Sequence, residues 1–299
     1  MVAAAAAALA IASLLAPAAS PASASAPRHY KHVIVVVMEN LSYDAARSSP
    51  GYRQLAARWA SMSASYASAH PSLPNYLDLT SGSTQGITSD CTSCFVNADN
   101  LAAELAAKHV SWGDFSEGAP HACFLDPYAG LYAGKHNPFR YYLDVRTTPA
   151  LCRHLVGLSS LMHSLTRGAA AVPAFSFVTP NLCHDGHSCP PSQAFSWLHG
   201  FVGAVTRSAA WKRSGLLVVT WDEGNGGDAS RVLPSGTVVS GGGGGHIPTL
   251  VVAPGVPRGT ALAQPMSHES LLATIEANFA VPYLAGASAW ASDTLVLPG

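Results

Sequence analysis

The feature that most constrains the fold of this chain is a series of short, continuous apolar runs rich in β-branched residues. A strand buried on both faces, as in a parallel sheet, has such a sequence, whereas a half-exposed strand alternates between apolar and polar residues. The runs lie at residues 32–38 (HVIVVVM), 174–179 (AFSFVT), 216–221 (LLVVTW) and 249–253 (TLVVA), with a weaker one at 110–115 (VSWGDF).

Helical patterns lie between these runs. Stretches rich in apolar residues with polar breaks predict helices at residues 52–60, 100–108, 191–207 and 269–279. Strands that alternate with helices predict an α/β fold with a mostly parallel central sheet flanked by helices. The stretch at 116–148 is rich in Pro, Gly and aromatic residues. We interpret it as an insertion that covers one end of the sheet.

The first 26 residues are mostly alanine, and we interpret residues 1–26 as a signal peptide. Their apolar run leads to the small-residue triplet ASA, which is typical of a cleavage site. A disordered tail and a membrane anchor are the alternatives, but Pro17 and Pro21 interrupt the run before it reaches a spanning length. We therefore expect a secreted protein with one domain over residues 27–299 and no stable membrane insertion.

The six cysteines form an even set, which in a secreted chain indicates disulfides. Of the many pairings that six cysteines permit, we predict Cys91–Cys94, Cys123–Cys152 and Cys183–Cys189. The spacing of Cys91 and Cys94 would also suit half of a zinc site, but no second Cys-x-x-Cys segment follows. The net charge is -1 with histidine neutral, so nothing indicates a nucleic-acid partner. We expect a monomer.

Polar side chains follow three of the apolar runs. Because ligands bind at the carboxyl ends of the strands in open parallel sheets, these side chains are candidate ligands. They are Glu39 and Asn40 after the first run, His184 and Asp185 after the run at 174–179, and Asp222 and Glu223 after the run at 216–221. Each one alone could be a helix cap. Together, oxygen donors and imidazoles predict one divalent metal ion, with calcium, magnesium, manganese and zinc all left open.

The segment HPSLPNYL at residues 70–77 contains a candidate nucleophile. Pro74 fits the first turn of a helix, which places Ser72 at or just before the helix N-terminus. Backbone N–H groups and the helix dipole favour an anion such as phosphate there. Coordination to a metal would activate the serine hydroxyl, so we expect Ser72 to be both nucleophile and metal ligand. A simple N-cap is the alternative.

These segments, taken in order, resemble the bacterial phosphoesterase family, which contains acid phosphatases and phospholipases C. The resemblance implies a fold similar to that of the alkaline phosphatase superfamily. It is most pronounced for short secreted acid phosphatases of actinobacteria, including enzymes with phosphatidylinositol-3-phosphatase activity. The matching segments are VIVVVMEN (33–40), HPSLPNYL (70–77), KHNPF (135–139), PNLCHDG (180–186), VVTWDEG (218–224), HIPTLVVAPG (246–255) and SHESLLATIE (267–276).

The resemblance also implies residue roles. Glu39, Asn40, Asp222 and Glu223 would hold the metal together with Ser72. His136, His184 and Asp185 would contact phosphate or protonate the leaving group. The expected function is a metal-dependent acid phosphatase that acts on small-molecule or lipid phosphate monoesters through a phosphoserine intermediate.

Three other functions remain as alternatives. A phospholipase C would act on phosphodiesters, but the chain has no obvious extra lipid-binding segment. A serine esterase would need glycines around its nucleophile, which Ser72 lacks. A non-catalytic binding protein would show neither metal nor turnover.

Overall fold

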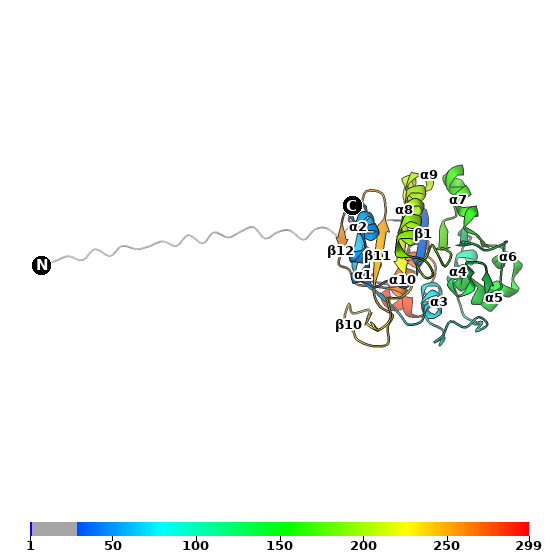
Figure 1. Cartoon of the computed structure of the whole chain (residues 1–299), viewed down its shortest axis with the longest axis horizontal. Coiled ribbons are helices and arrows are strands. Elements are labelled where there is room, and N and C mark those ends of the chain that lie inside the picture. The colour runs from blue at the N-terminus through cyan, green and yellow to red at the C-terminus, as the bar shows by residue number, and fades with distance from the viewer. Residues whose placement is uncertain (2–28, 299) are drawn as a thin grey trace.

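The computed structural model describes Met1 and residues 29–298, in which a central sheet lies between two layers of helices (Figure 1). Apart from Met1, the predicted signal peptide lies outside the described residues. The nine strands of the main sheet are β1 (His32–Met38), β2 (Ala60–Ala67), β3 (Trp112–Ser116), β6 (Leu155–Gly157), β7 (Phe175–Thr179), β8 (Gly215–Trp221), β11 (Gly245–Val252), β12 (Ala261–Leu262) and β13 (Met266–Ser267).

The remaining elements are helices and two small ribbons. The helices are α1 (Tyr43–Ser48), α2 (Pro50–Arg58), α3 (Ser72–Ser81), α4 (Leu101–Ala107), α5 (Leu143–Thr147), α6 (Pro149–Cys152), α7 (Leu158–Arg167), α8 (Pro191–Arg207), α9 (Ala209–Ser214) and α10 (His268–Phe279). The ribbons pair β4 (Tyr128–Ala129) with β5 (Tyr132–Ala133), and β9 (Arg231–Val232) with β10 (Val238–Val239). The four helices predicted from the sequence correspond to α2, α4, α8 and α10.

Five neighbouring strands are parallel, in the order β8-β1-β7-β3-β6. The prediction of a mostly parallel sheet flanked by helices is therefore confirmed. One strand differs, because β11 runs antiparallel to both β8 and β2. The chain between β8 and β11 contains a small ribbon and no helix, so it returns in the opposite direction without the helical crossover that parallel pairing requires.

Strand β1 has apolar neighbours on both faces, as its continuous apolar sequence predicts. Val33, Val35 and Val37 pack into one core cluster with side chains of α3, α4 and α10. Ile34 and Val36 alternate with them and pack into a second cluster with side chains of α2, α7, α8 and α9. Because β1 is buried on both faces, its carboxyl end holds the residues that follow it in fixed positions.

The three predicted disulfides are present, at Cys91–Cys94, Cys123–Cys152 and Cys183–Cys189. The segment at 116–148 contributes Phe139, Tyr141 and Tyr142 to the first core cluster, so it packs on the sheet rather than standing apart. Among the described residues, the structure contains no helix whose length and apolar character would suit a membrane span.

Candidate active site

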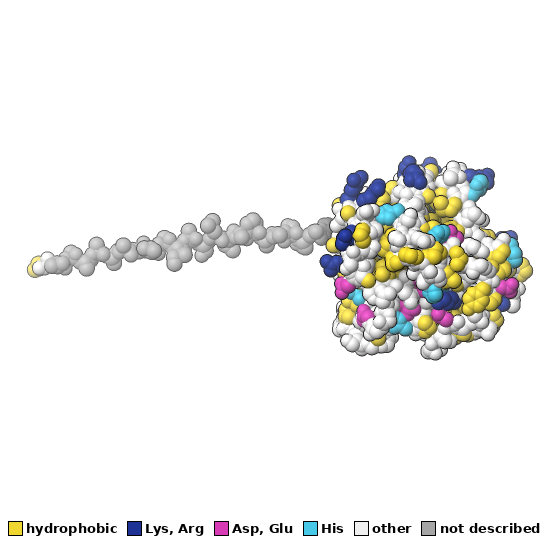
Figure 2. All heavy atoms as spheres, viewed as in Figure 1, with side chains coloured by type: hydrophobic (Ala, Val, Ile, Leu, Met, Phe, Trp, Pro, Cys, Tyr) yellow, Lys and Arg dark blue, Asp and Glu magenta, His cyan; other side chains and the backbone are white. Residues whose placement is uncertain are grey.

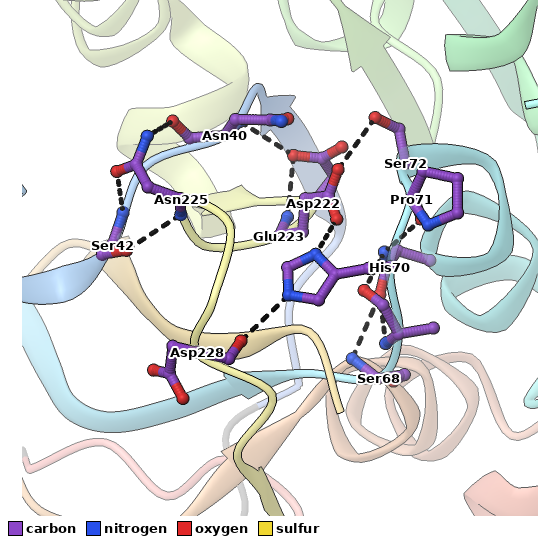
Figure 3. Close-up of polar contacts among 12 residues, drawn as sticks. Asn40, Ser42, Ser68, His70, Pro71, Ser72, Asp222, Glu223, Asn225 and Asp228 are labelled. Atoms are coloured by element: carbon purple, nitrogen blue, oxygen red, sulfur yellow. Dashed lines mark hydrogen bonds and ion pairs between the residues drawn. The ribbon is translucent and has the colours of Figure 1, made fainter. Parts of the chain in front are cut away.

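The carboxyl ends of β1 and β8 meet and bring the predicted acidic residues together. The backbone N–H of Asp222 donates to the carbonyl of Met38 at 3.0 Å. Asp222 Oδ1 in turn accepts from the backbone N–H of Asn40 at 3.1 Å and from that of Glu223 at 2.7 Å (Figure 3). Asp222 is fully buried and Glu39 nearly so. The carboxylate of Asp222 therefore ties two strand ends to each other instead of capping a helix.

Ser72 begins α3, as the sequence predicts, and its hydroxyl does not cap the helix. Pro71 is the N-cap residue, and Ser72 makes no capping bond, so the interpretation of Ser72 as a simple N-cap is wrong. Its Oγ instead donates to Glu223 Oε1 at 3.3 Å (Figure 3). The serine is 1% exposed. The structure thus places Ser72 beside the acidic residues at the ends of β1 and β8.

The N-terminus of α3 offers fewer free donors than the sequence implies. The backbone N–H of Leu73 donates to Asp90 Oδ1 at 2.9 Å, and Pro74 has no N–H. The other oxygen of Asp90 accepts from Lys135 Nζ at 2.8 Å. The first turn of α3 therefore leaves few backbone N–H groups for an anion.

Asn75 holds the loop that leads into the serine. Its Oδ1 accepts from the backbone N–H groups of Ser68 and Ala69 at 3.0 and 2.9 Å. Its Nδ2 donates to the carbonyls of Ala69 and Pro71 at 2.8 and 3.0 Å. The side chain is fully buried, and every polar group of its amide is used. The position of Ser72 therefore depends on this one amide.

His136 lies inside the cluster of acidic residues. Its Nε2 is 2.8 Å from Glu39 Oε1, and its Nδ1 is 3.3 Å from Asp185 Oδ2. Its ring stacks on Tyr76 with 5.2 Å between centroids. Burial disfavours the charged ring, but Glu39 and Asp185 outweigh burial and raise the pKa of His136 to about 9. The two carboxylates therefore favour the protonated form of His136.

His184 faces a different part of the molecule. Its Nδ1 pairs with Glu117, at 2.8 Å from Oε2, and its ring stacks on Trp197. Asp185, the next residue, points to His136 instead. The structure therefore brings Asp185 and His136 together and places His184 on the other side of the same loop.

The acidic residues lie so close together that their negative charges repel one another. Burial opposes the charged form of Glu39, but His136 overcomes that effect and holds the pKa of Glu39 below its ordinary value. Burial and the adjacent charge of Glu39 raise the pKa of Asp222 well above its usual range. Burial also raises the pKa of Glu223, although His70 works against it. An added positive charge would stabilise the ionised forms of Asp222 and Glu223.

Buried oxygens without partners test whether these residues suit a metal ion. Glu39 Oε2 and Asp222 Oδ2 are buried without a hydrogen-bond donor, and Glu39 Oε1 has only its ion pair with His136. Such orphaned carboxylate oxygens are rare in folded proteins, and a bound cation would satisfy them. Within residues 29–298, however, no group of three or more His, Cys, Asp or Glu side chains has the arrangement of a formed metal site. The chemistry of the donors fits a hard cation.

Two residues near the serine received no role from the sequence. The Nδ1 of His70 pairs with Glu223 Oε2, and its Nε2 lies 2.9 Å from the carbonyl oxygen of Asp228 (Figure 3). Lys135 bonds Asp90, and burial lowers its pKa less than the charges of Glu39 and Asp90 raise it. Both residues lie in segments that carry the family resemblance. His70 is two residues before Ser72 and Lys135 directly precedes His136, and this proximity to predicted site residues was the sequence signal that could have identified them.

Comparison with known proteins identifies the family. The model of the phosphoesterase family matches residues 45–282. The chain is 32% identical over 87% of its length to a phosphatidylinositol-3-phosphatase of Mycobacterium tuberculosis, of which it covers 80%. It is 26% identical over 83% of its length to an acid phosphatase of Aspergillus fumigatus and spans only 55% of that protein. A probable acid phosphatase of Kluyveromyces lactis is also 26% identical, over 85% of this chain and 59% of its own length.

Solved structures confirm the predicted type of fold. A protein of the alkaline phosphatase superfamily from Vibrio parahaemolyticus superposes with a TM-score of 0.53 at 14% identity, over 86% of this chain and 68% of that one. The phosphonate monoester hydrolase of Agrobacterium radiobacter gives a TM-score of 0.52 at 13% identity, over 84% and 74%. With the family match, these findings mean that the chain belongs to the phosphoesterase family and is a phosphoric-ester hydrolase.

Proposed function

We propose that this protein is a secreted, metal-dependent acid phosphatase that hydrolyses phosphate monoesters through a phosphoserine on Ser72. The observation that carries the proposal is the hydrogen bond from Ser72 Oγ to Glu223 Oε1, beside two buried carboxyl groups that each have one oxygen without a partner. The names of the relatives support a monoester substrate, and phosphatidylinositol 3-phosphate is the lipid to test first. The three disulfides are compatible with an extracellular location.

The carboxyl and amide oxygens at the strand ends would hold the cation. Glu39, Asp222 and Glu223 would supply the carboxylates, with Asn40 and the oxygen of Ser72 completing the set. When bound, a divalent cation lowers the pKa of the serine hydroxyl and offsets the charge of the phosphoryl oxygens.

The side chains of the cluster divide the proton transfers between them. Glu223 accepts the proton of the Ser72 hydroxyl as the serine oxygen forms a bond to phosphorus and the ester oxygen leaves. Glu223 is held for this step by His70, which pairs with its second oxygen. A protonated imidazole gives its proton to the departing alkoxide, and the imidazolium of His136 is the candidate inside the cluster. Water then attacks the phosphoserine, phosphate leaves, and Ser72 regains its proton.

Positive side chains offset the charge of the bound ester. Lys135 and His136 follow one another in the chain, and both lie beside Glu39. The relatives named acid phosphatases support a rate maximum at mildly acidic pH, whereas the charge of His136 persists into neutral solution because its pKa is raised to about 9. A rate maximum above about pH 8 would contradict this part of the proposal.

Ser72→Ala is the decisive variant. It should abolish hydrolysis of p-nitrophenyl phosphate, while the circular dichroism spectrum and the melting temperature stay close to those of the wild type. Ser65→Ala, in β2, is a matched control because it also removes a buried hydroxyl. Retained turnover in Ser72→Ala would reject the nucleophile. Faster turnover of p-nitrophenyl phosphorylcholine than of p-nitrophenyl phosphate would mean that the protein is a phosphodiesterase and not a phosphomonoesterase.

A further inference from the structure

A second feature of the carboxyl edge of the sheet is an open groove of about 900 Å³. Residues that follow three neighbouring parallel strands line its floor. Glu117 follows β3, Gly157 ends β6, and His184 lies in the loop after β7. Helices α7 and α8 supply its walls. Ligands of open parallel sheets bind at this edge, and the volume suits a small organic molecule.

The groove lies next to the candidate active site along the same edge. The strand order is β8-β1-β7-β3, so the end of β7 adjoins the end of β1, which carries Glu39, and the end of β3 lies one strand further on. Neighbouring strands lie about 4.8 Å apart, which puts the floor of the groove roughly 5–15 Å from Glu39. Helices α7 and α8 pack on the other face of the sheet from α3, and the loop after β7 reaches both places, because His184 lines the groove and Asp185 contacts His136.

The lining of the groove is amphipathic. Leu158 and Met162 of α7 and Trp197 and Phe201 of α8 form apolar walls, and the two α8 rings stack with 5.1 Å between centroids. Figure 2 shows hydrophobic side chains gathered on the face of the molecule that carries α8. The polar part is the pair of Glu117 with His184 on the floor of the groove.

The polar pair is fixed in place. Glu117 Oε2 accepts from the backbone N–H of Asn181 at 3.0 Å, and both its oxygens lie within 3.0 Å of His184 Nδ1. Since Nδ1 is engaged with Glu117, Nε2 is the nitrogen of His184 that remains for a ligand. An apolar wall with one oriented polar pair is typical of a site for an organic molecule with a polar end.

We propose that this groove binds the alcohol part of the phosphate ester and selects esters whose alcohol has an apolar, ring-sized body. The phosphoryl group would sit at Ser72, and the alcohol would extend over the loop after β7 toward Trp197 and Phe201. This inference rests on the proposed function, because it assigns the leaving group of the same reaction. A smaller cavity of about 100 Å³, lined by Val33, Leu216 and other residues, lies at the amino ends of the strands and cannot serve this purpose.

Gly200 in α8 allows the groove to be filled without disturbing the fold. It lines the groove, and a Cβ added to it would meet no heavy atom within 4 Å. Gly200→Phe therefore places a ring in the groove, and it also removes a glycine from a helix interior, where glycine is unfavourable. Gly203→Phe in the same helix is the matched control, because Gly203 is not part of the lining and its nearest neighbour is the flexible end of Arg207.

The test compares 1-naphthyl phosphate with glycerol 2-phosphate. Gly200→Phe should lower kcat/KM for the naphthyl ester about tenfold more than for the glycerol ester, chiefly through KM, because a ring contributes about this much to binding. Gly203→Phe should leave the ratio of the two substrates as in the wild type. An unchanged ratio in Gly200→Phe would overturn the proposal while leaving the phosphatase activity established.

Binding of the product alcohol gives an independent result. Isothermal titration of the wild type with 1-naphthol should show binding that Gly200→Phe weakens about tenfold. If neither ester is hydrolysed, the proposed function fails, and this titration still shows whether the groove binds the alcohol. Equal affinity in both proteins, or no binding to the wild type, would overturn the groove as an alcohol site.

Discussion

The hydroxyl of Ser72 donates a hydrogen bond to Glu223 Oε1 at 3.3 Å, although the two residues are 151 positions apart in the chain. The second oxygen of Glu223 pairs with His70, which lies two residues before the serine. One carboxylate at the end of β8 therefore contacts both the candidate nucleophile and the loop that carries it. This arrangement makes Glu223 an acceptor for the serine proton.

Glu223→Gln tests this assignment. Glutamine keeps the size of the side chain but cannot accept a proton at the working pH, so kcat for p-nitrophenyl phosphate should fall about 100-fold or more. Steady-state rates across pH 4–8 measure the effect. Glu104→Gln, on α4, is the matched control outside the cluster and should retain the wild-type rate. A kcat within a few-fold of the wild type in Glu223→Gln would remove Glu223 from the proton transfer.

Asp222→Asn tests the metal. Asp222 and Glu39 are adjacent buried carboxyl groups, so without a cation their ionised forms repel each other, and burial together with this repulsion raises the pKa of Asp222. We expect a chelator to abolish turnover of the wild type and to lower its melting temperature. Asp222→Asn should bind less metal by mass spectrometry and should lose less stability than the wild type on chelation, because its amide relieves the repulsion.

Asp126→Asn replaces an exposed carboxylate and is the matched control for the metal measurement. It should keep the metal content and the chelator response of the wild type. Unchanged metal content in Asp222→Asn, or a wild type that loses nothing on chelation, would contradict the metal site.

Asn75→Asp tests the amide that holds the serine loop. The substitution removes the two N–H donors to the carbonyls of Ala69 and Pro71 and leaves those oxygens facing a carboxylate. The expected cost is about 1–3 kcal/mol of unfolding free energy, with a lower kcat because Ser72 is displaced. Urea unfolding and steady-state rates measure the two effects. Asn97→Asp, at an exposed position, should change neither, and an unaltered kcat in Asn75→Asp would show that the loop holds its position without the amide.

The sequence could predict the strands that are buried on both faces, because a short, continuous apolar run such as that of β1 is typical of a strand with helices on either side. It did not predict β2. That strand reads ASMSASYA, in which small residues and serines replace the apolar run, and it lies at the side of the sheet where short strands pair with it. The direction of β11 was also beyond prediction, since an apolar run is the same in a parallel and an antiparallel strand. The loop before it decides the direction.

The candidate site could be predicted where residues follow a strand directly. Glu39 and Asp222 lie together because β1 and β8 are neighbours in the sheet. Residues in loops are harder, since adjacent side chains can point in opposite directions. His184 and Asp185 are an example, because one pairs with Glu117 and the other contacts His136. The pairing of His70 with Glu223 likewise depends on how the loop before α3 folds.

Glu276→Gln tests how a buried carboxyl group away from the site makes stability depend on pH. Glu276 is fully buried in α10, and its Oε1 accepts from the backbone N–H of Leu284 at 3.0 Å. Burial raises its pKa to about 8, although the hydrogen bond from Leu284 opposes the shift. Because the folded state keeps a proton that the unfolded state loses, this group's contribution to stability is complete below about pH 4 and is lost as the pH rises through 8.

The variant should therefore match the wild type near pH 4 and exceed it at pH 9. Glutamine keeps the acceptor for Leu284 and cannot ionise, so it avoids a cost on the order of a few kcal/mol in alkaline solution. Thermal melts of both proteins between pH 4 and 9 measure the divergence, with Asp126→Asn as the control that should run parallel to the wild type. Melting curves of Glu276→Gln that also run parallel to those of the wild type would mean that Glu276 ionises in the folded state as readily as in water.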